Sequence, residues 1–300
     1  MKRKIIKQAS QAYTITLPID WVRNNNLDEK SEVNVDVVEK SLIISHDKRI
    51  LGERVKINVS GLNERNIIRH ISALYAKGAD EIEIESDKDI SQIIINRINQ
   101  HMGYAIISQD KNKTVIKDVS GTPQSDLDEI FKRVFQMILS FYDSAKNDIF
   151  GKESETIESL KSRDMEINKF CLYLQRAVNK MSYSDPLNGR VLFAYSFEIE
   201  KIGDEIERLW RTNIKYDVKK TPYLKKVLDL VGECLNLAFD FYYQTNPKIS
   251  EKMYELREEV REMAMEKPKT NEFTARLMRH ATKIAEEAAD LNHLTLIRRL

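Results

Sequence analysis

Prolines divide the second half of this chain into helical segments. From residue 126 onward the apolar residues recur with the 3.6-residue period of a helix, and Pro186, Pro222, Pro247 and Pro268 fall where such a pattern stops or starts. Two three-helix units in tandem, packed as one bundle, are the simplest arrangement of these segments. The sequence therefore predicts six helices, at roughly 126–150, 154–182, 187–214, 222–245, 249–266 and 270–299.

The helix expected at 222–245 is the most hydrophobic segment of the chain. Its sequence VLDLVGECLNLAFDFYY is apolar nearly all round, so we expect it at the centre of the bundle. Charged residues interrupt the run, which argues against a membrane span. Cys171 and Cys234 sit inside apolar helical patterns without metal-like spacing, and we expect both to be reduced core residues. Together with a start, MKRKIIKQAS, that has no apolar signal region, this favours a cytoplasmic protein.

The third and sixth predicted helices follow related patterns. FEIEKIGDEIERLW (197–210) places Glu200 and Asp204 one turn apart on one face, about opposite the helix's apolar stripe and so pointing away from its core face. TARLMRHATKIAEEAADL has a matching stripe but carries Ala275 and Arg279 where those acids would fall. The chain therefore contains a repeated helical unit with an acidic pair in one copy only.

Two interpretations of Glu200 and Asp204 remain open. Like charges one turn apart repel by roughly 0.2–0.5 kcal/mol, a cost that a bound cation removes. Carboxylate oxygens suit hard ions such as Mg, Ca or Mn, and iron as well. A solvated charge ladder explains the same spacing, because Arg208 follows Asp204 at the favourable distance. Glu286 and Asp290 on the sixth helix are either a substitute pair or ordinary solvated acids.

Few other residues are candidates for chemistry. Asp164, in SRDMEINKF on the second helix, is a candidate to approach the acids of the third. His280, beside Arg279 on the polar side of the sixth helix, is expected to be a surface histidine. No nucleophile and base stand at a telling spacing, so we expect no enzymatic activity. A metal-dependent phosphatase activity abolished by Glu200→Ala would reverse that expectation.

The first fifty residues have the pattern of β structure. QAYTITLP (11–18) alternates apolar and polar residues as a half-buried strand does, and IDWVRNN follows as a short helix. The asparagine cluster at 24–26 suits a left-handed stop. VNVDVVEKSLIIS (33–45) reads as two strands joined by a turn around 39–41. Because this piece is too short to bury much surface alone, we expect it to dimerise.

The start of the chain is basic although the net charge of the whole is only +1. Lys2, Arg3, Lys4 and Lys7 all come before the first acid, Asp20. A local basic arm can contact phosphates even when the molecule is nearly neutral. The alternative is a solubilising, frayed terminus.

Residues 53–119 form a separate pattern of short strands and helices. The segments VKINV, NERNIIRHISALYAKG, DEIEIES, DISQIIINRINQHMG, YAIIS and KTVIKDV give a β-α-β-α-β-β order, compatible with a small open-faced sheet covered by two helices. No glycine-rich phosphate loop interrupts it, and we assign it no cofactor. With GTPQSD (121–126) as a linker, the fold class is multidomain α+β, with domains at 1–50, 53–119 and 125–300.

KRKIIKQASQAYTITLPIDWVRNNNL, followed by VNVDVVEKSLIIS, resembles the swapped-hairpin DNA-binding domain of the AbrB/SpoVT type. The threonine–isoleucine strand, Leu17-Pro18, the short helix and Leu27 all fall in order. In the turn after Leu27 the family usually has Gly-Asp, whereas this chain has Lys30-Ser31. The resemblance implies a dimer whose paired hairpins present a basic surface to the DNA backbone, with Lys2, Arg3, Lys4 and Lys7 as contacts and Arg23 as a second candidate.

EKIGDEIE and RHATKIAE each resemble the signature of PhoU, the phosphate-uptake regulator, whose two three-helix repeats carry a glutamate-to-aspartate metal motif. The resemblance covers about residues 125–299. It implies a single remaining site for a divalent metal or iron, at Glu200 and Asp204. The first copy matches at Glu200, Ile202, Gly203 and Asp204, and the second, without the acids, at His280, Ala281, Thr282, Ile284, Ala285 and Glu286.

The two resemblances together are similar to archaeal phosphate-uptake regulators that carry an AbrB-like head. They imply a DNA-binding transcriptional regulator of phosphate homeostasis whose helical part senses a metal, a ligand or a protein partner. The alternative is an adaptor that binds a phosphate transporter or a kinase and uses its head only to dimerise. DNA affinity distinguishes the two.

Overall fold

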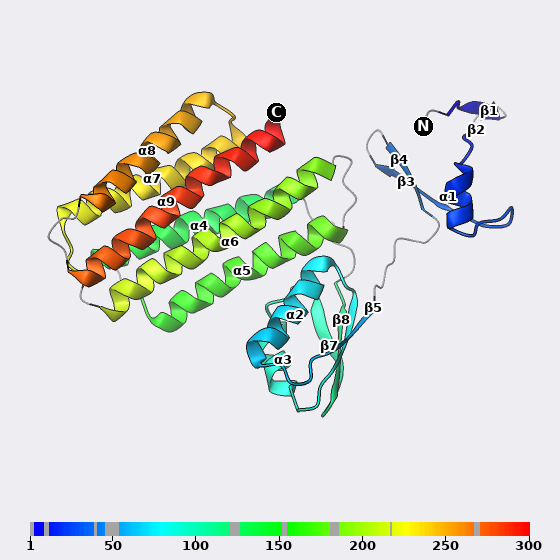
Figure 1. Ribbon diagram of the computed structural model, residues 1–300, viewed down its shortest axis with the longest axis horizontal. Helices are drawn as coiled ribbons and strands as arrows, with labels where there is room; N and C mark the ends of the chain where they lie inside the picture. Colours follow the sequence, from blue (N-terminus) through cyan, green and yellow to red (C-terminus); the bar gives the residue numbers. More distant parts are fainter. Residues whose placement is uncertain are drawn as a thin grey trace. The chain divides into compact units, whose positions relative to one another are not determined.

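The computed structural model describes residues 3–8, 12–38, 41–45, 54–120, 127–151, 155–180, 186–216, 218–266 and 271–300. The chain divides into two compact units, an N-terminal unit (Met1–Leu51) and a C-terminal unit (Gly52–Leu300). Within the C-terminal unit, a small sheet packs against a helical bundle (Figure 1).

The N-terminal unit consists of two short antiparallel hairpins and one helix. The sequence predicts only the second strand of the first hairpin. Its first strand carries no apolar alternation that would distinguish it from a basic tail. The predicted turn after the helix is confirmed, since Asn26 adopts the left-handed φ of 51°. The elements are β1 (Ile6–Gln8), β2 (Ala12–Thr14), α1 (Ile19–Asn24), β3 (Asn34–Val38) and β4 (Ser41–Ser45).

The C-terminal unit contains a four-stranded sheet. The strand order is β5 (Arg54–Asn58), β6 (Glu81–Glu85), β8 (Lys113–Asp118) and β7 (Tyr104–Asp110), and only the β5–β6 pair is parallel. Asn63 caps the helix α2 (Glu64–Lys77) by accepting a hydrogen bond from the Asn66 amide, and Gly78 ends α2 with a φ of 106°. The predicted element order is confirmed by β5 (Arg54–Asn58), α2 (Glu64–Lys77), β6 (Glu81–Glu85), α3 (Ser91–Ile98), β7 (Tyr104–Asp110) and β8 (Lys113–Asp118).

The predicted helices of the bundle are all present. Pro186, Pro222 and Pro247 are the first residues of three of them, as expected of a residue that lacks an amide hydrogen, whereas Pro268 lies outside the described residues. Among the described helices, none is both long and apolar enough to cross a membrane. The helices are α4 (Leu127–Ile149), α5 (Ile157–Lys180), α6 (Pro186–Lys215), α7 (Pro222–Tyr243), α8 (Pro247–Met265) and α9 (Glu272–Arg299).

The expectation that the helix at 222–245 lies at the centre of the bundle is wrong. The principal pairing that joins α4–α6 to α7–α9 is between α6 and α9, whereas α7 packs mainly on α8 and α9 (Figure 1). The polar residues Lys225, Asp229, Glu233, Asn236 and Asp240 follow at spacings of three and four and give α7 a solvent face, although Asn236 itself bonds to the helix backbone. Whether the two groups of three helices are repeats of one unit stays a prediction.

Gly203 allows α6 to pack closely on two neighbouring helices. A Cβ atom at this position would lie 3.3 Å from Ile138 of α4 and 3.4 Å from Ile167 of α5. The buried side of α6 is therefore wider than the single stripe recognised in the sequence. Gly203 in the EKIGDEIE motif serves close helix packing.

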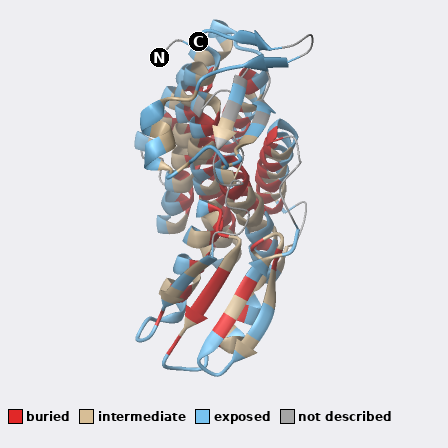
Figure 2. Ribbon diagram, turned by 90° about the vertical axis from the view of Figure 1, so that its right-hand side faces the viewer, coloured by how far each residue is buried: buried red, intermediate tan, exposed pale blue. Residues whose placement is uncertain are grey.

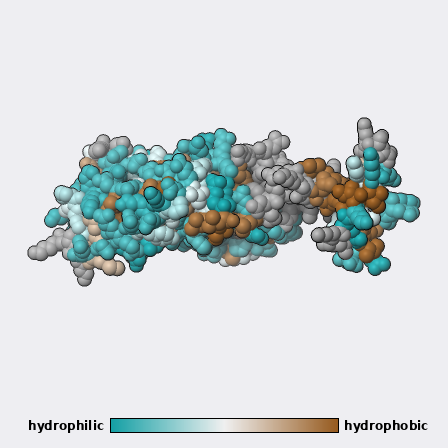
Figure 3. Space-filling model, turned by 90° about the horizontal axis from the view of Figure 1, so that it is seen from above, coloured by the Kyte–Doolittle hydropathy of each residue, from teal (hydrophilic) through white to brown (hydrophobic). Residues whose placement is uncertain are grey.

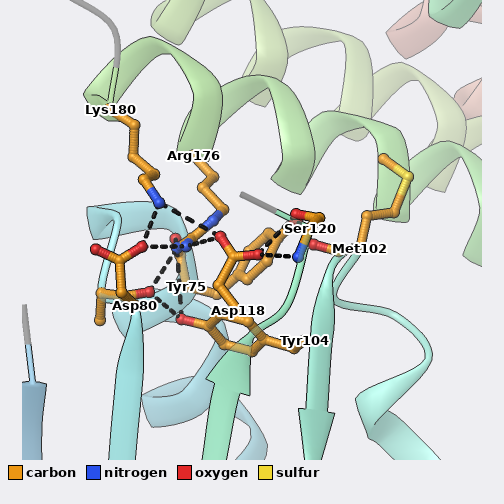
Figure 4. Close-up of polar contacts among 9 residues, drawn as sticks. Tyr75, Asp80, Met102, Tyr104, Asp118, Ser120, Arg176 and Lys180 are labelled. Atoms are coloured by element: carbon orange, nitrogen blue, oxygen red, sulfur yellow. Dashed lines mark hydrogen bonds and ion pairs between the residues drawn. The ribbon is translucent and has the colours of Figure 1, made fainter. Parts of the chain in front are cut away.

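Arg176 of α5 joins the sheet to the bundle (Figure 4). Its guanidinium is 1 % exposed, donates to the carbonyls of Tyr75 and Ala79 at 3.0 and 2.7 Å, and lies 2.6 Å from the Asp118 carboxylate. It also stacks over the rings of Tyr75 and Tyr104. Burial opposes ionisation of Asp118, but hydrogen bonds from Ser120 and Arg176 hold its pKa below the ordinary value. The sheet and the bundle are thus held together by a satisfied, buried ionic contact.

Candidate nucleic-acid interface

The described residues of the N-terminal unit do not form a core of their own. Among its described side chains none is buried, whereas the C-terminal unit has two hydrophobic cores (Figure 2). Large apolar side chains that would ordinarily be buried are exposed here, and Figure 3 shows the corresponding hydrophobic surface. Hairpins of this size are only marginally stable in water unless another protein surface covers their apolar side chains.

One face of the second hairpin is apolar on both strands. Val35 is paired with Ile44, and Val37 with Leu42, so the four side chains share a face. Val37 is 76 % exposed and Leu42 62 %. A face of this composition on a two-stranded hairpin indicates a protein partner at this surface.

The turn after α1 is closed by side chains. The Ser31 hydroxyl donates to the Asp28 carboxylate at 2.7 Å, and the Lys30 amide donates to the same oxygen at 3.0 Å. The hydrogen bond from Ser31 is the main reason that the pKa of Asp28 is lowered. These contacts explain how the chain makes this turn with Lys30-Ser31 in place of Gly-Asp.

The predicted basic residues that lie within the described ranges are exposed. Arg3, Lys4 and Lys7 lie on and just before β1, and Arg23 occupies the last turn of α1. None of these four forms an ion pair with another residue of the described ranges. Lys2 lies outside those ranges. Unpaired cations on an exposed strand are what contact with a phosphate backbone requires.

The acids of α6 do not lie as predicted. Glu200 is half-buried, and burial followed by repulsion from Asp204 raises its pKa. Asp164 of α5 joins them: burial, then the charges of Asp204, Glu207 and Glu200, raise its pKa to about 7. The expectation that Glu200 and Asp204 point away from the packed side is therefore wrong for Glu200, because Gly203 brings α5 close to this side of α6.

Within the described residues, no group of three or more histidine, cysteine, aspartate or glutamate side chains is arranged to hold a metal ion. Arg208 donates to Asp204 at 2.7 Å, which is the charge-ladder interpretation of the motif. Ala275 and Arg279 are exposed on α9. A metal at Glu200 and Asp204 stays a prediction from the sequence.

A buried acid that the sequence reasoning missed links α6 to α9. Glu205 is 3 % exposed and accepts hydrogen bonds from His280 at 2.7 Å and Lys283 at 2.6 Å, with Arg208 as a third partner. Burial opposes its ionisation, but these three donors lower its pKa to about 2. His280 is consequently not the surface histidine that we expected. The spacing of His280 and Lys283, three residues apart on the sixth helix, places two hydrogen-bond donors on one face, but it does not identify the acid that they contact.

The remaining sequence candidates have structural roles. Cys171 and Cys234 are both free and buried in the bundle core, as predicted. Glu286 pairs with Arg261 of α8 at 3.3 Å, and Asp290 is exposed. Glu286 and Asp290 therefore do not act together as the substitute pair of acids considered above.

Residues 6–51 match the family of antidote-toxin recognition MazE, a bacterial antitoxin. No curated protein matches the chain. The match covers the hairpins, α1 and the turn described above, and MazE/AbrB-type domains bind DNA and dimerise. The N-terminal unit therefore contains a MazE/AbrB-like domain.

Proposed function

We propose that this chain is a DNA-binding regulator whose N-terminal unit forms its binding surface as a dimer. The observation that carries the proposal is the group of exposed cations Arg3, Lys4 and Lys7 on and before β1 of a MazE/AbrB-like unit, which form no ion pair within the described part of the chain. Two copies would bring two such groups together and extend the phosphate-contacting surface. The exposed apolar face of the second hairpin supplies the reason to dimerise.

Salt-dependent DNA binding tests the cationic surface. The full chain is titrated with a mixed-sequence duplex at several salt concentrations, and the logarithm of affinity should fall linearly with the logarithm of salt. Each phosphate contact removed should make the slope shallower by about 0.9. We expect this of Arg3→Ala/Lys4→Ala/Lys7→Ala and not of the control Lys30→Ala, which is equally exposed in the same unit. An unchanged slope in the triple variant excludes this surface.

The oligomeric state tests the apolar hairpin face. Val37→Glu introduces a charge there, and we expect it to convert a dimer to a monomer in sedimentation equilibrium. Val119→Glu is the matched control, because Val119 is 63 % exposed in the C-terminal unit. A Val37→Glu protein that sediments as the parent does shows that this face is not the dimer contact.

The finer proposal is that phosphate status regulates the DNA binding. It is supported by the resemblance of α6 to the PhoU signature, including the close-packing Gly203. The test compares DNA affinity in phosphate with that in sulfate at equal ionic strength, because both anions screen charge alike. Equal affinities contradict phosphate sensing. The adaptor alternative predicts no DNA binding at all, together with co-purification with a membrane transporter or a kinase.

A further inference from the structure

A groove between α4 and α5 is lined by two arginines over an apolar floor. Its volume is about 370 Å³, within the range of small-molecule sites. Met137 and Phe141 of α4 and Ile167 of α5 form the floor, while Gln136 and Ser162 supply neutral polar groups. Such a lining suits a ligand with an apolar body and a few polar groups.

An arginine bridges the two helices at each end of the groove, one reaching from α4 to α5 and the other from α5 to α4. Arg133 of α4 lies over the ring of Phe170 of α5, at 5.0 Å. Arg163 of α5 lies over the ring of Phe141 of α4, at 5.6 Å, and its guanidinium donates to Ser140 at 3.5 Å. Seven residues separate Arg133 from Ser140 along α4, so the two ends are about 10 Å apart at 1.5 Å per residue.

The two ends differ in chemistry. The Arg133 guanidinium has no hydrogen bond or ion pair with any residue of the described ranges, so its donors are free for an anion. Arg163 is already engaged by Ser140, by Glu155 at 3.8 Å, and by the rings of Phe141 and Trp210. The rings of Phe141 and Trp210 are themselves buried, so that end favours a flat ring that stacks on the outer face of the Arg163 guanidinium.

The charge of the groove is compatible with an anion. Glu166 is the acid of the lining, and Lys169 lies 3.4 Å from it. The charges of Glu166 and Lys169 cancel, so the net charge of the groove comes from its two arginines. Of these, only Arg163 has an acidic neighbour, Glu155 at 3.8 Å. A free guanidinium presents a fork of donors that an anionic group such as a phosphate can accept bidentately. The hydroxyl and amide groups that line the middle of the groove suit the sugar hydroxyls of a nucleotide.

We propose that the groove between α4 and α5 binds a purine nucleoside monophosphate, with the phosphate on Arg133 and the base at the Phe141–Arg163 end. The sugar then lies over Met137 and Ile167, within reach of Gln136 and Ser162. This site is separate from the N-terminal unit, and the inference does not depend on DNA binding.

Isothermal titration of the full chain with AMP, GMP, adenosine and inorganic phosphate tests the site. We expect a nucleotide to bind more tightly than adenosine or phosphate alone. Arg133→Ala should weaken nucleotide binding at least about tenfold, the effect of losing a charge-assisted hydrogen bond, while leaving adenosine binding unchanged. Glu166→Gln should strengthen nucleotide binding, because it removes the acid of the groove.

Lys132→Ala is the matched control, since Lys132 is exposed on the neighbouring position of α4 and does not line the groove. Its nucleotide affinity should equal that of the parent. Arg133 is exposed, so its loss should leave the helical content unchanged, which circular dichroism checks. The proposal is overturned if neither nucleotide binds, if phosphate or adenosine binds as well as the nucleotide, or if Arg133→Ala and Lys132→Ala behave alike.

Discussion

The guanidinium of Arg176 on α5 lies 2.6 Å from the carboxylate of Asp118 at the end of β8, and both groups are buried. A residue of the bundle therefore supplies the buried cation that pairs with a carboxylate at the end of a sheet strand (Figure 4). Removing one partner of a buried ion pair leaves the other charge uncompensated.

We predict that Arg176→Met lowers the free energy of unfolding by about 3–5 kcal/mol. The methionine keeps the apolar length of the side chain but cannot donate to the carbonyls of Tyr75 and Ala79. It also leaves Asp118 with only Ser120 and the longer contact to Lys180 at 3.3 Å. Urea unfolding measures the loss, and faster amide exchange in the sheet than in the bundle would show where it acts. Lys161→Met on the exposed side of α5 is the control, and an equal effect there would contradict a special role for Arg176.

Glu205 should make the contact between α6 and α9 sensitive to acid. Its pKa is lowered to about 2 in the folded protein from an ordinary value of 4.5. Its contribution is therefore complete above about pH 4.5 and is lost as the pH falls from there towards 2. We expect Glu205→Gln to cost about 3 kcal/mol at neutral pH, with the difference from the parent shrinking below pH 4.5. Urea titrations at a series of pH values measure this.

The control for Glu205 is Glu286→Gln. Glu286 also pairs with a cation on a neighbouring helix, Arg261, but both side chains are 41 % exposed. An exposed pair of this kind is worth no more than about 1 kcal/mol. A Glu205→Gln protein as stable as the Glu286→Gln protein would show that Glu205 does not hold the two helices together.

Local sequence signals were sufficient for most of the elements. The prolines set the starts of α6, α7 and α8, because a residue without an amide hydrogen fits the first helical turn. The left-handed Asn26 and the β3–β4 hairpin were likewise recognisable from neighbouring residues. Each of these features depends on interactions within a few residues, which a single sequence displays directly.

Contacts between distant segments were not recognisable in the same way. Nothing in the local sequence distinguishes Glu205 from other helix acids, because its partners His280 and Lys283 are about 75 residues away and their contact depends on α6 meeting α9. Arg176 likewise has its partners far along the chain, with Asp118 58 residues and Tyr75 101 residues away. The misplacement of α7 arose from average hydrophobicity, which concealed the regular spacing of its polar residues.

Asp164 should destabilise the bundle at high pH. Its pKa of about 7 lies above the ordinary 3.8, so the folded state holds this proton more tightly than the unfolded state. Its ionisation therefore reduces stability progressively as the pH rises from about 4 through 7. We expect Asp164→Asn, which cannot ionise, to be more stable than the parent by about 2 kcal/mol near pH 8 and equal to it near pH 4. Urea unfolding at the two pH values checks this, and a constant difference would contradict it.

The predicted metal at Glu200 and Asp204 has a specific obstacle, which is the guanidinium of Arg208 at 2.7 Å from Asp204. A divalent cation has to displace that guanidinium before both carboxylates can bind it, and electrostatic repulsion between the two cations weakens binding further. We therefore expect Arg208→Ala to bind Mn²⁺ at least about tenfold more tightly than the parent in isothermal titration. Because Arg208 also contacts Glu205, the control is Arg208→Ala/Glu200→Ala/Asp204→Ala, which has the same loss at Glu205 and should not bind. Equal Mn²⁺ affinity in both variants, or none in either, would show that these acids do not form a metal site.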